Sequence, residues 1–539
     1  MSDPNLQSTV TPTQFIKTWR LIFNDLSSPN KLVQLLILMA TTHILFLSDY
    51  TKNKLSTVDI TTIIVTFVTF IAAYMYSLRK QSNQISNYKN YNEGYYYYHL
   101  TNHKNGVFDV FYLIFLPLSF SLLYSSDTTT SKMLILNCCL LFNYLRIPVF
   151  TKIPLQSIFG YLILSSYYSN HDVAVPELSH LFIVYCCIIN YMICWILVKV
   201  SQLKSFTLIE CNLFSILLTN VLFIVDFSST SLPFQILQKS LIALFIIMLA
   251  NFIIDPLFTK PQSMTRSGLL LSNILVGFPI LINYLLTPIF HSSNYTPIIW
   301  LYNYIMQSPT RLVILCVWLS CLLILIPNIV IFCQNGVSLN TSRKVWHFLI
   351  LLLISIPFKY DPDFVKISLA GTIPLFLIVE YIRFLQIWPI GSMLDMKLRS
   401  FADFRDNQGP IIISYIYLII GCALPLLIDN QLWGVISLGV GDSFASIIGG
   451  RYGKIFWYGT KKTFEGTLAF ILLTFVTSIV LFIFYTSTQN NRDIGLTWDL
   501  ASRYLLNCFV SGILEANSDM NDNILVPAFM LVLSKLMHI

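Results

Sequence analysis

Residues 432–466 read LWGVISLGVGDSFASIIGGRYGKIFWYGTKKTFEG, and this stretch decides how the rest of the chain is interpreted. It begins with the apolar composition of a membrane helix and then places Asp442, several glycines and four basic residues within a few turns. A charge inside a membrane segment is costly and is usually functional. Backbone N–H groups at glycines, beside clustered cations, can bind phosphate. The stretch therefore predicts a phosphate-binding site in a membrane-embedded protein.

The composition of the whole chain places it in a membrane. Of its 539 residues, 55% are apolar and only 11% are charged, whereas a soluble domain carries about 25% charged residues. Apolar runs recur from residues 32–48 to 524–538 and predict an all-α polytopic integral membrane protein with roughly 13 to 16 transmembrane helices. The eleven cysteines lie mostly in apolar runs without CxxC spacing, which favours buried small side chains over a zinc site. The scattered basic residues do not indicate nucleic-acid binding.

The charge pattern divides the chain into three parts. Residues 1–31 are polar and predict a cytosolic or peripheral segment, and residues 32–334 predict a multi-span scaffold with few ionisable residues. In residues 335–539, charges enter or flank the spans and glycine and proline interrupt them, which indicates a polar cavity at membrane depth. Excess Lys and Arg in short loops stays cytosolic, so this cavity is expected to open to the cytosol.

Small and polar side chains alternate along the first helix of the opening stretch. Gly441, Ala445 and Gly449 are four residues apart, and Asp442 and Ser446 form an adjacent face. Close helix packing explains the small residues equally well, but it does not explain the carboxylate. Residues 449–454, GGRYGK, then supply flexible backbone and two cations.

A second helix is expected to begin near Thr463. Thr463 is placed to cap it, with Glu465 in its first turn and Lys461 and Lys462 at its positive end. Such an end can bind phosphate, although a basic cytosolic flank with an ordinary cap remains the alternative. The segment is not a Walker A loop, because Ile455 follows Gly453-Lys454.

Three more charged segments are candidates for the site. Residues 343–347, RKVWH, open a span and offer phosphate contacts, with a basic interfacial flank as the alternative. Residues 403–410, DFRDNQGP, offer ligands for Mg²⁺ or a hydroxyl group, or form a solvated connector. Residues 514–523, LEANSDMNDN, offer oxygen ligands for Mg²⁺ or a base, or form an acidic loop without EF-hand spacing.

Together these segments resemble the CTP-dependent polyprenol kinases, and within that family the dolichol kinases. The family combines an RK-x-x-H element, an Asp-x-Arg-Asp loop ending in Gly-Pro, a glycine-rich GxGDxxAS signature followed by KKT-x-EG, and a closing EA-x-S with DN and Pro. The matching residues are Arg343, Lys344 and His347; Asp403, Arg405, Asp406, Gly409 and Pro410; Gly439, Gly441, Asp442, Ala445, Ser446, Gly449 and Gly453; Lys461, Lys462, Thr463, Glu465 and Gly466; and Glu515, Ala516, Ser518, Asp522, Asn523 and Pro527. The matched segments cover residues 335–539, whereas the first 330 residues match only as a generic multi-span region. A long N-terminal half of this kind is nevertheless what a dolichol kinase looks like.

The resemblance implies transfer of the γ-phosphate of CTP to the terminal hydroxyl of dolichol, which gives dolichyl phosphate and CDP and supplies the lipid carrier for protein glycosylation. The resemblance implies that the protein binds CTP and a dolichol or polyprenol lipid. It also implies a location in the endoplasmic reticulum membrane, with the site facing the cytosol. The residue types in these segments make Asp442, Glu515 and Asp522 catalytic candidates, and Asp442, Glu465 and Asp522 candidate ligands for Mg²⁺ or another divalent cation. The expected CTP-binding set is Gly441, Ser446, Gly449, Gly450, Arg451, Gly453, Lys454, Lys461, Lys462, Thr463, Glu465, Arg343, Lys344 and His347.

Other functions fit parts of the pattern. A CDP-diacylglycerol synthase shares the glycine-rich signature but adds a D-R-x-D segment that this chain lacks, and diacylglycerol and phytol kinases have the catalytic part without the long N-terminal half. A transporter would fit the many spans. The sequence shows no inverted repeat, and its polar segments gather near one end, so an enzyme is favoured.

Overall fold

The computed structural model describes residues 26–48, 55, 59–69, 71, 108–124, 127–145, 147–170, 180–223, 231–258, 264–290, 296–325, 339–399, 402, 406, 409–486 and 496–539. Nearly all of these residues are helical, and within them there is no β-strand, only one isolated antiparallel bridge between Phe456 and Thr463. The predicted all-α class is therefore confirmed. Most of residues 1–31 and the whole of 79–106 lie outside the described part of the chain.

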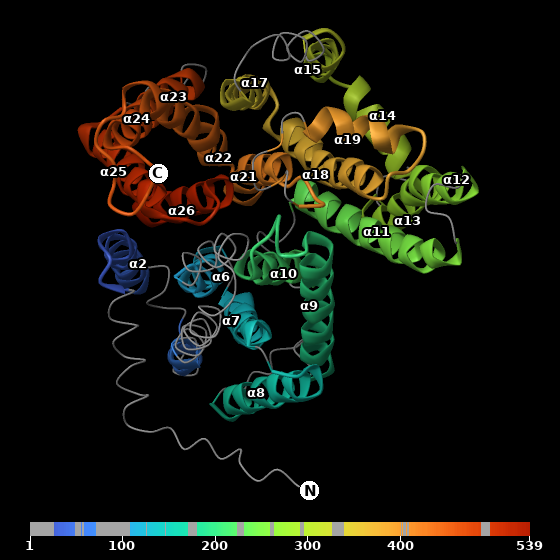
Figure 1. Ribbon diagram of the computed structural model, residues 1–539, viewed down its shortest axis with the longest axis horizontal. Coiled ribbons are helices and arrows are strands. Elements are labelled where there is room, and N and C mark those ends of the chain that lie inside the picture. Colours follow the sequence, from blue (N-terminus) through green and yellow to red (C-terminus); the bar gives the residue numbers. More distant parts are fainter. Residues whose placement is uncertain are drawn as a thin grey trace, which may run out of the picture.

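The helices form three neighbouring groups (Figure 1). The N-terminal group contains α2 (Pro29–Leu47), α6 (Val110–Tyr124), α7 (Asp127–Leu141), α8 (Val149–Asn170), α9 (His180–Ser201) and α10 (Leu208–Phe223). The second contains α11 (Leu232–Ile254), α12 (Met264–Ser272), α13 (Phe278–Phe290), α14 (Pro297–Met306), α15 (Pro309–Ser320), α18 (Pro362–Phe384) and α19 (Ile390–Arg399). The third contains α17 (Leu339–Tyr360), α21 (Ser414–Asp429), α22 (Trp433–Ile436), α23 (Ser443–Tyr452), α24 (Phe464–Thr486), α25 (Trp498–Asn517) and α26 (Asp522–Met537).

Several helices are long and apolar enough to cross a membrane. Six such helices occur in the described residues, at Pro29–Leu47, His180–Ser201, Leu232–Leu257, Met264–Phe290, Pro362–Phe384 and Phe464–Thr486. The pair α14 and α15 passes the same test but bends by 99°, and further apolar helices, among them α6 and α10, are shorter. The chain is thus a polytopic membrane protein, and the count of 13 to 16 spans stays a prediction.

Two apolar runs of the sequence, residues 133–150 and 432–449, are interrupted in the structure. The apolar run 133–150 does not form one helix, because α7 ends at Leu141 and the chain turns through Phe142–Tyr144 before α8 begins. The run 432–449 contains a π-helical segment, Ser437–Asp442, between α22 and α23. π-Helical turns are rare in proteins overall, and those that do occur are frequently found at functional sites.

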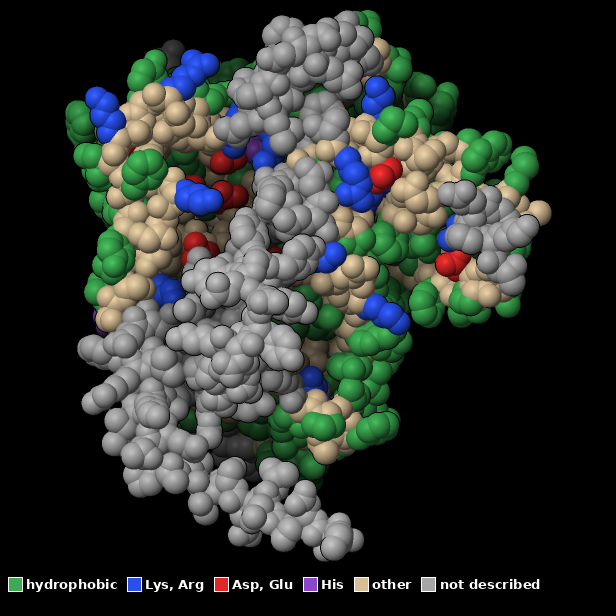
Figure 2. Space-filling view, viewed as in Figure 1, with side chains coloured by type: hydrophobic (Ala, Val, Ile, Leu, Met, Phe, Trp, Pro, Cys, Tyr) green, Lys and Arg blue, Asp and Glu red, His purple; other side chains and the backbone are tan. Residues whose placement is uncertain are grey.

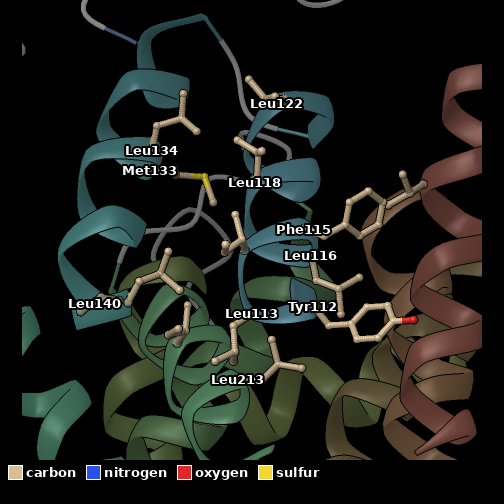
Figure 3. Close-up of a cluster of buried hydrophobic side chains, with 14 of the residues drawn as sticks. Tyr112, Leu113, Phe115, Leu116, Leu118, Leu122, Met133, Leu134, Leu140 and Leu213 are labelled. Carbon is tan, nitrogen blue, oxygen red and sulfur yellow. The ribbon is translucent and has the colours of Figure 1, made fainter. Parts of the chain in front are cut away.

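One apolar core joins the N-terminal and C-terminal helices. Leu113 and Phe115 of α6 belong to the same buried cluster as Leu525 and Phe529 of α26. Figure 3 shows this cluster around α6, with the ring of Tyr112 directed toward the C-terminal helices. The N-terminal helices therefore pack directly on the helices that carry the predicted site.

Candidate functional site

The first part of the site lies where α17 meets the π-helical segment. The Nζ atom of Lys344 is 2.6 Å from Oδ2 of Asp442, and Nδ1 of His347 is 3.2 Å from the same oxygen. Nδ1 of His347 also lies 3.1 Å from the carbonyl oxygen of Leu438. All three charged or polar side chains are largely buried, where an unpaired charge would be strongly destabilising. Two segments 98 residues apart in sequence thus meet at one carboxylate.

Glycines bring the π-helical segment close to its neighbours. A Cβ atom on Gly439 would lie 2.9 Å from Cβ of Leu351 in α17, and one on Gly441 would lie 2.5 Å from a ring carbon of Phe470 in α24. Side chains at these positions would force the helices apart. Gly441 therefore serves close helix packing, which was the alternative interpretation of the small-residue stripe.

A tight turn connects α23 to α24. The main-chain N–H of Trp457 donates to the carbonyl of Lys462 at 3.0 Å, and that of Phe464 donates to Ile455 at 2.8 Å. Gly459 closes the turn with a φ of +73°, which a residue with a side chain rarely adopts. The turn fixes the two lysines beside the start of α24.

The start of α24 has the expected cap. The N–H of Gly466 donates to Oγ1 of Thr463 at 3.2 Å, which confirms Thr463 as the N-cap. The carboxylate of Glu465, in the first turn, accepts N–H bonds from Lys454 at 2.9 Å and from Ile455 at 3.3 Å. Glu465 therefore ties the basic turn to α24, and its oxygens already have main-chain donors.

The second part of the site gathers around Lys462. Its ammonium group pairs with the carboxylate of Glu515, donates to the Glu515 carbonyl oxygen at 2.8 Å, and lies 3.6 Å from Oδ2 of Asp522. Partial burial opposes the charged form of Lys462, but the carboxylates of Glu515 and Asp522 outweigh it and raise the pKa of Lys462 above its ordinary value, with a smaller contribution from Asp442. The π-helical segment that ends at Asp442 packs against α24 and α26, so the two parts of the site lie on neighbouring elements.

The remaining predicted residues lie around this site with different exposures. Gly449 and Gly453 pack against Thr463, since a Cβ on either would lie 2.7 Å from its Oγ1. Ser446 and Arg343 are half-buried. The exposed members are Gly450, Arg451, Lys454 and Lys461. Figure 2 shows basic and acidic side chains gathered on the face where the ends of α23–α26 meet.

The predicted metal ligands are only partly brought together. Within the described residues, no group of three or more His, Cys, Asp or Glu side chains is arranged to hold a metal ion. Asp442, Glu465 and Asp522 therefore do not form a ready three-carboxylate site. Asp522 is about one third exposed and lies at the N-terminus of α26, so it has room for a further ligand.

The described residues of the 403–410 segment, Asp406, Gly409 and Pro410, include two with structural contacts. The carboxylate of Asp406 accepts N–H bonds from Ile413 and Ser414 at 3.1 and 3.2 Å and so caps α21. The carbonyl of Pro410 accepts a bond of 2.6 Å from the buried guanidinium of Arg383, which also pairs with Glu380. Asp403 and Arg405 lie outside the described residues.

Sequence reasoning missed the contribution of the N-terminal helices. Nε2 of Gln34 in α2 donates to the carbonyl oxygen of Asn517 at 2.6 Å, and the hydroxyl of Tyr112 donates to Oε1 of Gln34 at 2.7 Å. Asn30, one turn before Gln34, lies beside Gly459 of the basic turn. Two buried amides four residues apart in an apolar span were the available signal.

The protein is therefore a polytopic membrane protein whose apolar helices enclose a buried cluster of charged side chains, an arrangement typical of an enzyme site. Residues 2–226 match the family model described as the dolichol kinase N-terminal domain. The chain is 41% identical over 431 residues to dolichol kinase of Saccharomyces cerevisiae, covering 80% of this chain and 77% of that protein. The chain therefore belongs to the dolichol kinase family.

More distant relatives match a smaller part of the chain. The dolichol kinase sec59 of Schizosaccharomyces pombe is 36% identical over 260 residues, and the human dolichol kinase is 30% identical over 261 residues. Each match covers 44% of this chain and about half of the relative, 50% and 47% respectively. No solved structure matches the chain. The family match to residues 2–226 agrees with the expectation that a long N-terminal half is typical of a dolichol kinase.

Proposed function

We propose that this protein is a dolichol kinase that transfers the γ-phosphate of CTP to the terminal hydroxyl of dolichol and releases dolichyl phosphate and CDP. Membership of the dolichol kinase family supports the acceptor and the reaction. The observation that carries the chemistry is the cluster in which Lys462 joins Glu515 and Asp522, beside helices that pack against the segment carrying Asp442. CTP as donor rests on the resemblance of the glycine-rich and KKT-x-EG segments.

The charged site suits phosphoryl transfer because that reaction is mostly positioning and charge neutralisation. The hydroxyl oxygen attacks the γ-phosphorus, the bond from this phosphorus to the β–γ bridging oxygen breaks, and CDP leaves. Lys462 and the exposed cations Arg451, Lys454 and Lys461 would hold the phosphates, together with N–H groups of residues 449–453. Glu515 or Asp442 would orient the hydroxyl and accept its proton.

A divalent cation fits the oxygen-rich side of the site. Mg²⁺ commonly binds one or two carboxylates together with substrate phosphates rather than a complete protein cage. Asp522 and Asp442 are the residues that would hold it, since the oxygens of Glu465 accept main-chain bonds. When bound, the ion would neutralise charge on the phosphates.

The basic loops support a site on the cytosolic side of the membrane. Arg451, Lys454 and Lys461 share one turn, and short loops rich in Lys and Arg stay on the cytosolic side. The endoplasmic reticulum as location, where the product would serve protein glycosylation, rests on the family resemblance.

The test uses microsomes that contain the wild-type chain, supplied with dolichol and CTP labelled at the γ-phosphate. Labelled dolichyl phosphate and unlabelled CDP are expected, and Asp442→Asn and Lys462→Ala variants at equal level are expected to lose this activity. Release of pyrophosphate would indicate a cytidylyltransferase, and labelling of diacylglycerol in place of dolichol would indicate a different acceptor. Full activity in both variants would overturn the site assignment.

A further inference from the structure

A short helix with an exposed apolar side follows the end of α18. This helix, α19 (Ile390–Arg399), has 10 residues and is therefore about 15 Å long at the helical rise of about 1.5 Å per residue. The hydrocarbon core of a bilayer is about 30 Å thick, so α19 is too short to cross it. The side chains of Trp388, Met393 and Met396 are nevertheless 55%, 54% and 74% exposed. A patch of exposed apolar side chains marks a contact with a membrane or with another protein.

One side of α19 is covered by the protein itself. α19 packs on α18 (Figure 1). A Cβ atom on Gly391 would lie 2.6 Å from the main-chain carbonyl carbon of Gln386, so the first turn of α19 touches the chain that leaves α18. The side chain of Leu394 packs against a buried cluster that contains Ile382 of α18. This side of the helix therefore has no room for a further partner.

A second side of α19 carries charged groups. The carboxylate of Asp395 pairs with the buried guanidinium of Arg383 in α18 and with Nε of Arg399, which lies 2.9 Å away. Arg383 also donates a 2.6 Å hydrogen bond to the carbonyl oxygen of Pro410, just before α21. These contacts fix the rotation of α19 about its own axis and connect α19 to the start of α21.

The remaining side of α19 is apolar and exposed. Ile390, Met393 and Met396 follow one another in steps of three residues, which places them within an arc of about 120° on a helix of 3.6 residues per turn. All three are exposed, and the exposed Lys397 lies within the same arc. A helix with an apolar side and a charged edge is typical of helices that lie in the membrane interface. Trp388, just before α19, is a residue type enriched at that level.

α19 lies at the same end of the helices as the basic turn. The end of α18 meets the start of α21 through Arg383 and Pro410. α21 runs away from this junction and ends at the left-handed residue Asn430, which reverses the chain. α22 then runs back along α21, since a Cβ on Gly434 would lie 2.0 Å from the carbonyl oxygen of Gly421, and α23 continues to the basic turn. Figure 2 shows charged side chains over α18 and α19 on the same face as those of the charged site.

We infer that α19 is an interfacial helix whose exposed side binds the boundary between phospholipid headgroups and acyl chains, at the end of the helices where the basic turn lies. α18 is long and apolar enough to cross a membrane, so α19 continues a surface that already faces lipid. Lys397 favours a membrane over a protein partner, because lysine is depleted in protein interfaces, whereas its long stem lets the ammonium group reach lipid phosphates. This binding does not depend on the proposed reaction, and it holds the start of α21 at a fixed depth.

Spin labels measure the depth of α19 in a bilayer. The full chain carrying Met393→Cys or Ser392→Cys is labelled with a nitroxide and reconstituted into dioleoyl phosphatidylcholine vesicles, with labelled wild-type protein as the blank for native cysteines. Ser392 is exposed next to the charged edge and is the matched control. The label at Met393 is expected about 5 to 10 Å into the headgroup and acyl boundary. Its ratio of collisions with oxygen to collisions with a water-soluble nickel complex is expected to be several-fold higher than that at Ser392.

Two results of this experiment would overturn the inference. Equal access of the nickel complex to both labels would place the apolar side of α19 in water. An immobilised label at Met393 that neither oxygen nor the nickel complex reaches would indicate a protein partner, such as a second copy of this chain.

The fluorescence of Trp388 provides a second measurement on an almost unchanged protein. Wild type and Trp388→Phe are compared in vesicles whose lipids carry bromine, a quencher, either near the headgroup or near the ends of the acyl chains. The difference in fluorescence between the two proteins reports on Trp388. This difference is expected to be quenched more strongly by bromine near the headgroup. Quenching by neither lipid, or stronger quenching by the deep bromine, would reject an interfacial position.

Discussion

The side-chain amide of Gln34 donates a 2.6 Å hydrogen bond to the main-chain carbonyl of Asn517, two residues after Glu515. The hydroxyl of Tyr112 donates a hydrogen bond to the oxygen of the same amide. The segment that carries Glu515 and Asp522 is therefore positioned by α2 and α6 as well as by Lys462. This contact gives the N-terminal helices a direct connection to the charged site.

Replacing Gln34 tests that connection. Gln34→Leu leaves the buried carbonyl of Asn517 and the hydroxyl of Tyr112 without these partners, and the free energy of unfolding is expected to fall by about 1 to 3 kcal/mol. Activity is expected to fall with it, because the Glu515 segment loses a fixed position. Thermal unfolding in detergent and kinase assays provide the measurements. His43→Ala, at an exposed position of the same helix, serves as control, and equal behaviour of the two variants would contradict the prediction.

Variants of the Lys344–Asp442 pair can distinguish a structural role of Asp442 from a chemical one. Asp442→Asn leaves a buried lysine unpaired, which is expected to destabilise the protein by about 3 to 5 kcal/mol. The double variant Lys344→Met with Asp442→Asn removes the charge and is expected to recover most of that stability without recovering activity. Thermal unfolding and initial rates on the same samples distinguish the two effects. Recovery of activity in the double variant would show that Asp442 acts only through Lys344.

The two adjacent lysines of the basic turn are expected to differ. Lys462 contacts Glu515 and lies near Asp522, whereas Lys461 is exposed. Lys462→Ala is expected to lower kcat by about 10²- to 10³-fold, the effect of losing one preorganised charge-stabilising donor. Lys461→Ala is expected to raise the KM for CTP without changing thermal stability. Equal kinetic effects of the two changes would contradict this assignment.

The raised pKa of Lys462 predicts how the stability difference between wild type and Lys462→Ala depends on pH. Because the folded-state pKa is raised above the ordinary value of about 10.4, the stabilisation by Lys462 is fully present below that value and is lost only as the pH rises through the raised pKa. The stability difference between wild type and Lys462→Ala is therefore expected to be constant between about pH 7 and pH 9. A decline of this difference within that range would count against the charged cluster.

Two glycines of the signature are expected to respond in opposite ways. Gly441→Ala places a Cβ 2.5 Å from Phe470, and the resulting overpacking is expected to destabilise the protein by about 1 to 3 kcal/mol. Gly450 has open space around it, and Gly450→Ala within α23 is expected to stabilise by about 0.5 to 1 kcal/mol. Unfolding curves in detergent measure both changes. Similar shifts for the two would show that packing does not explain Gly441.

Removal of divalent cations tests the proposed metal. Chelation with EDTA is expected to abolish phosphorylation, and added Mg²⁺ to restore it, because the phosphate charges then lack a counter-ion. Asp522→Asn is expected to raise the Mg²⁺ concentration needed for half-maximal activity, while Asp499→Asn, an exposed acidic position on α25, is expected to leave it unchanged. Full activity in EDTA would exclude a divalent requirement.

Local sequence rules predicted the start of α24 well. The cap by Thr463 and the first-turn carboxylate of Glu465 follow from short-range hydrogen bonding, which nearby residues determine. The all-α membrane class could be predicted from composition, because the main-chain groups of a chain this apolar must be hydrogen-bonded within helices in the membrane.

Contacts between residues far apart in the sequence could not be predicted from these local rules. The residue types at Lys344, His347 and Asp442 indicated a site, but only the packing of α17 on the π-helical segment brings them together. The π-helical turn was not predicted either, and it lies where Leu351 and Phe470, both distant in sequence, closely approach two of its glycines. The polar side chains of Asn30 and Gln34 in an apolar helix were a signal of a contact, but their partners near Asn517 lie about 480 residues away and could not be identified from the sequence.

The separation between Gln34 and Asn517 also has a consequence for biosynthesis. The ribosome adds about 5 to 20 residues per second, so α2 is made roughly half a minute to a minute and a half before Asn517 exists. During that interval the amide of Gln34 has no final acceptor, and the Glu515 segment can be ordered only after α25 has joined α2. The charged site is therefore among the last features of the chain to mature.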